Sequence, residues 1–146
     1  MNVLFLPSFF QNNKESSIQK NKQVVYLCFP TSNRNLYEQY RITGVERIEL
    51  FANIDIGGYA WARYGFCTKN RSETINAIRF PSLTTKQEKK IMDIINEHFD
   101  NSNTPFPMNR IAKLPYGKKA LLGGYWEGVL DLTDARQRGV LERYLR

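Results

Sequence analysis

The segment that decides the fold is Ile48-Glu49-Leu50-Phe51-Ala52-Asn53-Ile54-Asp55-Ile56-Gly57-Gly58-Tyr59-Ala60-Trp61-Ala62-Arg63-Tyr64-Gly65-Phe66. Its first half places an aliphatic residue at every second position, which predicts a β-strand with one buried face. The glycine pair permits a tight turn or a close approach of the backbone to another group. We expect a short helix over residues 59–65. If these residues instead form a strand, Tyr59, Trp61 and Arg63 share one face, whereas in a helix Tyr59 and Arg63 align and Trp61 turns away.

Earlier in the chain, a run of β-branched and aromatic residues at 24–29 predicts a buried strand that stops at Pro30. Thr31 or Ser32 can then cap a helix that ends near Gly44 and carries apolar residues on one side. These apolar residues are Leu36, Tyr37 and Tyr40.

The second half of the chain predicts more helix than strand. Thr85-Lys86-Gln87-Glu88 matches a capping box, and an apolar stripe follows it, formed by Ile91, Ile94, Ile95, His98 and Phe99. A short helix is expected at 109–114, followed by a break at 115–117 and a short strand at 129–132. Thr133 or Asp134 caps a last helix whose inward residues are Val140, Leu141, Tyr144 and Leu145.

Together these elements predict an α+β protein, with strands early and helices late in the chain. At 146 residues the chain has the size of one domain with a single core. We expect one compact domain over residues 1–146, with a small, mainly antiparallel sheet packed against two or three helices. The polar residues 11–23 are expected to form a mobile loop.

The net charge of +7 favours an anionic partner, either nucleic acid or a protein surface. The excess of Lys and Arg is spread over both halves, so an ordinary solvated surface explains it equally well. No stretch has the length and polarity of a membrane span or a secretory signal, and we expect a cytoplasmic protein, in the host cell if the chain is phage-encoded. The oligomeric state stays open.

The residues around the glycine pair form the main candidate binding site, because they combine backbone freedom, stacking surfaces and a fixed cation. They are Gly57, Gly58, Tyr59, Trp61, Arg63 and Tyr64. A helix that starts after two glycines could present its first amides to an anion, and Arg63 could add a bidentate contact. The alternative is that the aromatic residues are packing residues of the core.

A second Gly-Gly-Tyr triplet, at residues 123–125, precedes Trp126 and Glu127. If the two triplets meet, Asp55, Arg63 and Glu127 would surround a pocket lined by the two tryptophans, and Tyr125 and Trp126 would join the binding site. Asp55 or Glu127 could then act as a catalytic base. The simpler interpretation of Glu127 is a surface glutamate.

Several other kinds of chemistry have little support in the sequence. Cys28 and Cys67 lack the spacing of a zinc site, and His98 is the only histidine, so we predict no metal site. We also predict no cofactor. Two reduced thiols are expected, and a disulfide between Cys28 and Cys67 is the alternative. His98 is expected to be a hydrogen-bonded helix residue. Seven basic residues could form a face around Tyr116: Lys86, Lys89, Lys90, Arg110, Lys113, Lys118 and Lys119. This face could bind along a phosphate backbone, or it could be an ordinary solvated helix surface.

Two motifs carry a resemblance to a known group of proteins. The run Gly-Gly-Tyr-Ala-Trp-Ala-Arg-Tyr-Gly-Phe at 57–66 and the run Trp-Glu-Gly-Val-Leu-Asp-Leu at 126–132, with a helix between them, resemble a module of bacteriophage and mobile-element proteins. The resemblance covers about the last hundred residues. It implies a genetic setting and host interaction, and it implies no particular activity.

Three functions follow as hypotheses. The first is a phage or mobile-element accessory protein that binds host or foreign nucleic-acid machinery through the aromatic and arginine residues at the glycine pair. The second is a small transferase that holds a nucleotide-bearing cosubstrate there. The third is a structural or assembly component of a phage particle.

Overall fold

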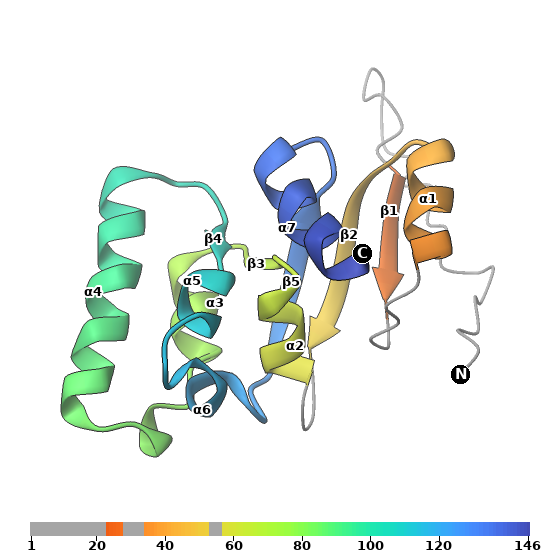
Figure 1. The fold of residues 1–146 in the computed structure, drawn as a ribbon. Coiled ribbons are helices and arrows are strands. Elements are labelled where there is room, and N and C mark those ends of the chain that lie inside the picture. The colour runs from red at the N-terminus through yellow and green to blue at the C-terminus, as the bar shows by residue number, and fades with distance from the viewer. Residues whose placement is uncertain (1–22, 28–33, 53–56) are drawn as a thin grey trace.

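The computed structural model describes residues 23–27, 34–52 and 57–146, and it shows an α+β fold (Figure 1). The strands are β1 (Gln23–Leu27), β2 (Val45–Ala52), β3 (Cys67–Thr68), β4 (Phe106–Pro107) and β5 (Trp126–Asp131). The helices are α1 (Arg34–Ile42), α2 (Gly57–Arg63), α3 (Arg71–Asn76), η2 (Phe80–Ser82), α4 (Thr85–Asn101), α5 (Asn109–Ala112), α6 (Gly117–Leu121) and α7 (Ala135–Leu145).

The five strands form one sheet in the order β1-β2-β5-β3-β4. Among the described strands, only the β1–β2 pair is parallel, and β5 runs antiparallel to both of its neighbours, β2 and β3. In the β2–β5 pair, Leu50 faces Gly128 and Phe51 faces Glu127. The mainly antiparallel sheet of the sequence prediction is therefore confirmed.

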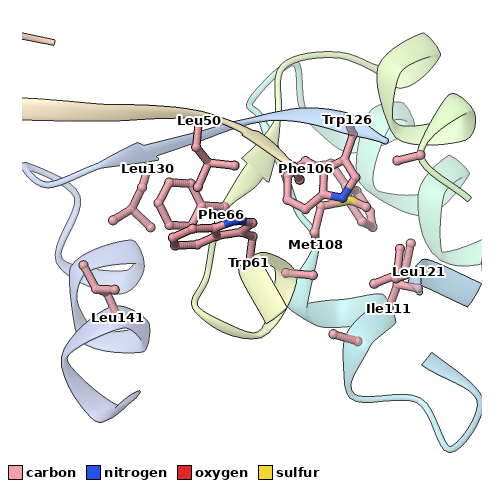
Figure 2. Packing of buried hydrophobic residues seen from close by; sticks show 14 of the residues in the cluster. Leu50, Trp61, Phe66, Phe106, Met108, Ile111, Leu121, Trp126, Leu130 and Leu141 are labelled. Atoms are coloured by element: carbon pink, nitrogen blue, oxygen red, sulfur yellow. The ribbon is translucent and has the colours of Figure 1, made fainter. Parts of the chain in front are cut away.

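The core lies on one face of the β2–β5 pair, as the alternation in β2 predicts. Ile48, Leu50 and Ala52 are buried, whereas Arg47 and Phe51 are exposed. Figure 2 shows Leu50 and Leu130 directed from the strands toward Trp61, Phe66 and Leu141 of the helical side. At the far side of the molecule from β1, α4 packs on α3 and β4 through its buried Ile91 and Ile95 (Figure 1).

Helix caps fix where the later helices begin. Thr84, rather than Thr85, is the N-cap of α4: its side chain accepts a hydrogen bond from the Gln87 N–H, and the Gln87 side chain accepts one from the Thr84 N–H. The capping box therefore exists one residue earlier than predicted. Asp134, one of the two predicted caps, is the N-cap of α7. Its side chain accepts hydrogen bonds from the backbone N–H groups of Gln137 and Arg136, and these bonds, chiefly the one from Gln137, lower the pKa of Asp134.

Other predicted boundaries moved or lie outside the described residues. The strand predicted at 129–132 begins earlier, at Trp126, and α6 begins at the Gly117 where a break was expected. The expected order of early strands and late helices was wrong, because β4 and β5 come from the second half of the chain. The loop predicted at 11–23 lies almost wholly outside the described residues, and so do Cys28, Phe29, the Thr31 or Ser32 cap and residues 53–56.

Candidate binding surface on helices α2 and α7

Residues 57–63 form a helix, so the side chains of the predicted site are distributed around it instead of lying on one face. Tyr59 and Arg63, one turn apart, align: the guanidinium carbon of Arg63 lies 5.7 Å from the centre of the Tyr59 ring. Trp61 turns away into the core, where it is 5% exposed. The helical alternative of the sequence analysis is therefore correct.

Gly58 shows why a glycine is required at the start of α2. A Cβ at this position would lie 2.6 Å from the Leu121 carbonyl oxygen and 3.0 Å from that of Gly124. The two Gly-Gly-Tyr segments thus meet in space through backbone contact. Because carbonyl oxygens, the negative ends of peptide dipoles, stand beside Gly58, this side of the first turn does not suit an anion.

The two tryptophans serve as packing residues of the core. Trp61 lies edge-on to the Phe66 ring, with ring centres 5.2 Å apart. Trp126 is 3% exposed, and its Nε1 lies 3.3 Å from the place of a Gly58 Cβ. Figure 2 shows the Trp126 ring beside Phe106 and Met108. Both tryptophans are therefore buried, as in the packing interpretation of the sequence analysis.

Arg63 is exposed and lies between two tyrosine rings. The second ring belongs to Tyr144 of α7, whose centre is 5.3 Å from the guanidinium carbon. A hydrogen bond with Tyr144 raises the pKa of Arg63, so the side chain stays a cation at every physiological pH. Tyr64 completes the group, with its ring centre 5.3 Å from that of Tyr144. We call Tyr59, Arg63, Tyr64 and Tyr144 the arginine–tyrosine cluster.

Tyr144 is the member that sequence reasoning missed. It was predicted to pack inward from the last helix, but it is 39% exposed and packs sideways against α2. Gly65, at a φ of 99°, allows this approach, since a Cβ there would lie 2.8 Å from Val140 of α7. The sequence contains two hints of this contact, the glycine after Tyr64 and the four-residue spacing of Val140 and Tyr144 on one helix face. Only the fold shows that these two segments meet.

Glu127 does not join the arginine–tyrosine cluster. It alternates with the buried Trp126 on β5, so it lies on the opposite face of the sheet from Trp61 and α2. There its carboxylate lies 3.7 Å from the Lys69 ammonium. This placement fits the surface glutamate of the simpler interpretation and contradicts a site shared by Glu127 and Arg63. Asp55 lies outside the described residues.

Tyr125 also lies away from the arginine–tyrosine cluster. Its ring is 64% exposed and meets Phe51 edge-on, with ring centres 4.5 Å apart. Phe51 and Glu127 are cross-strand partners, so Tyr125 belongs to the solvent face of the sheet. The predicted binding residues are thus divided among the core, the helical surface and this solvent face.

The remaining reactive groups are engaged in structure. The His98 Nε2 lies 2.9 Å from the Thr104 carbonyl oxygen, and the ring packs edge-on against Phe99 and Phe106, as expected of a helix histidine. Burial, and secondarily the charge of Asp134, raise the pKa of the free thiol of Cys67 to about 12. Within the described ranges, no group of three or more His, Cys, Asp or Glu residues could hold a metal ion.

The basic residues that were predicted to form one face are spread over three helices, α4, α5 and α6. Arg110 is engaged with the Glu97 carboxylate at 2.9 Å and lies over the Phe106 ring. Lys118 and Lys119 are exposed on α6. The basic face around Tyr116 stays a prediction.

The fold and the surface define an α+β protein with an arginine–tyrosine cluster at the junction of α2 and α7. No protein-family model, curated protein or solved structure matches the chain. Of the helices in the described part, none is long and apolar enough to cross a membrane.

Proposed function

We propose that this chain is an accessory protein that works by binding an anionic partner through the arginine–tyrosine cluster. The observation that carries the proposal is the position of Arg63, exposed at the surface and held between the rings of Tyr59 and Tyr144. The two rings restrict the Arg63 side chain before an anion binds. The side chain therefore loses less conformational entropy on binding.

The charges around Arg63 support an external partner. Every acidic residue in the described segments lies farther from Arg63 than ion-pair distance, whereas Arg47, Arg110 and Arg138 each have a carboxylate within 4.0 Å. A guanidinium has donors in a planar fork that match a carboxylate or a phosphate. The net charge of +7 would draw an anionic partner toward the chain.

The bacteriophage or mobile-element setting belongs to the same proposal. It is supported by the two motifs of the resemblance, which lie close together: the Trp126 Nε1 is 3.3 Å from the place of a Gly58 Cβ. In that setting the anionic partner would belong to host or foreign nucleic-acid machinery.

The test compares two arginine variants of the full chain. We expect Arg63→Ala to weaken binding to fluorescein-labelled anionic probes, an oligoglutamate peptide and an oligonucleotide, at low salt. Arg71→Ala is the matched control, because Arg71 is also an exposed helical arginine but contacts Asn96 on α4. Thermal unfolding should be similar for both variants. Equal binding of all probes by R63A and R71A would refute the proposal.

A further inference from the structure

From the surroundings of the arginine–tyrosine cluster we infer that the anionic partner is a single-stranded nucleic acid. Its phosphates would contact Arg63 and Arg143, and one base would stack on Tyr144. The inference rests on the proposed function and names the partner of the same surface.

The line of α7 residues that faces α2 is defined by contacts. Val140 and the Gln137 carbonyl lie 2.8 Å and 3.6 Å from the place of a Gly65 Cβ, and Tyr144 meets Tyr64. With 100° per residue, Arg143 lies next to this line on the side away from the core residue Leu141. Arg143 is exposed, and its Nε donates to the Gly139 carbonyl, which leaves the outer edge of the guanidinium for a ligand.

The charges on this surface are of one sign. Helix α2 contains no acidic residue, and the single one in α7, Glu142, lies on another side of the helix, where it accepts a hydrogen bond from Tyr37 at 2.6 Å. Arg63 lies over the Tyr144 ring, Arg143 precedes Tyr144 in the chain, and among the described residues neither arginine forms an ion pair with a carboxylate. A phosphodiester backbone supplies the complementary charge repeatedly along its length.

The tyrosine ring distinguishes among the anionic polymers. Tyr144 is 39% exposed beside Arg63 and follows Arg143 in the chain, and an aromatic residue near cations is typical of proteins that bind single strands. In a duplex the bases are paired and stacked on one another, so an exposed ring on the protein surface gains no stacking partner. An acidic protein would satisfy the arginines but would not use the ring.

The experiment measures fluorescence anisotropy of the full chain with three labelled probes: a thymidine oligonucleotide, a duplex of the same length and an oligoglutamate peptide. We expect the single strand to bind best and to be released by added salt. Tyr144→Leu should lower the affinity for the single strand roughly tenfold, because it removes the stacking ring. Tyr144→Phe keeps the ring and should keep most of the affinity. Arg143→Ala should weaken binding, and Arg138→Ala, which pairs with Glu142 on another side of the same helix, is its control.

Two results would overturn the inference. One is equal or tighter binding of the duplex, and the other is equal single-strand affinity of Y144L and Y144F. If the chain binds only oligoglutamate, and R63A loses this binding, the single-stranded nucleic acid is excluded as the partner. The proposed function, binding of an anionic partner through Arg63, would then stand. If the wild-type chain binds none of the three probes, both the inference and the proposed function fail.

Discussion

Neighbouring residues in the Gly57–Phe66 segment have opposite roles. Trp61 is a core residue, whereas Arg63, two positions later, belongs to a surface cluster. From the sequence, packing in the core and binding at the surface were two alternative predictions for the segment as a whole. The helix divides them residue by residue, because side chains two positions apart on a helix point in different directions.

At Gly58 we predict that one added methyl group destabilises the protein. In a free helix, Gly→Ala is favourable by about 1 kcal/mol. Here the new Cβ would lie 2.6 Å from the Leu121 carbonyl oxygen, a backbone atom that cannot rotate away. Overpacking costs about 1–3 kcal/mol, so we expect Gly58→Ala to lower the free energy of unfolding.

Gly139 provides the matched control in chemical denaturation. It lies in α7 with nothing within 4 Å of its Cβ position, so Gly139→Ala should raise the free energy of unfolding by up to about 1 kcal/mol. If the free energy of unfolding of Gly58→Ala equals that of Gly139→Ala, Gly58 does not lie in close contact with the Leu121 backbone.

At Cys67 we predict a thiol that does not react in the native state and a loss of stability at alkaline pH. The folded-state pKa is about 12, against about 8.5 in an unfolded chain. Folding thus favours the neutral thiol. Its contribution is fully present below pH about 8.5 and is lost as the pH rises toward about 12, because only the unfolded state ionises in this window.

Two measurements test this. Alkylation by iodoacetamide at pH 8, followed by peptide mapping, should leave Cys67 unmodified until the protein is unfolded. The melting temperature should fall less between pH 8.5 and 10 in Cys67→Ala than in the wild type. Rapid native alkylation of Cys67 would contradict its burial.

At the scale of single elements, the long helix and the alternating strand were predictable because their own periodicity defines them. Helix α4 and the buried residues Ile91 and Ile95 follow from the sequence, and so do the buried residues of β2. Strands β3 and β4 have two residues each, and no periodicity exists over two residues. They form because Cys67 and Thr68 pair with Pro107 and Phe106, contacts that no local pattern encodes.

For the start of α4 we predict that Thr84 matters and Thr85 does not. Thr84→Ala removes the side-chain acceptor for the Gln87 N–H and should cost about 1 kcal/mol. Thr85→Ala, one residue later, removes an exposed side chain within the helix and should be nearly neutral or slightly stabilising. Urea denaturation of the two variants distinguishes the observed cap from the one that the Thr85–Glu88 pattern suggests, and a larger loss for Thr85→Ala would favour the latter.

At the scale of the whole molecule, the α+β class was predictable but the sheet order was not. The class follows from the mixture of periodicities, whereas the position of β5 between β2 and β3 depends on pairings of residues that are 62 (Cys67 and Val129) to 84 (Arg47 and Asp131) positions apart. Which residues gather around Arg63 was not predictable for the same reason. Which face Glu127 occupies, and that Tyr144 reaches Arg63, depend on how distant elements are placed.

The central place of β5 predicts a large effect of its buried side chain. Leu130 is fully buried beneath the sheet, so Leu130→Ala should cost about 2–5 kcal/mol of unfolding free energy through lost burial and a cavity. Leu122→Ala is the control, since Leu122 is 40% exposed in the connection before β5 and should change stability little. Similar midpoints for the two variants would argue against β5 as the centre of the core.

The strand order also has a consequence for synthesis of the chain. Of the strands in the described part of the chain, β5 is synthesised after the other four, yet it joins β2 to β3. Until residues 126–131 emerge, both neighbours expose unpaired backbone edges, which are templates for wrong pairing. The growing polypeptide must therefore protect the open edge of β2 from residue 52 onward and the open edge of β3 from residue 107 onward, and a chain cut short before residue 126 cannot close this sheet.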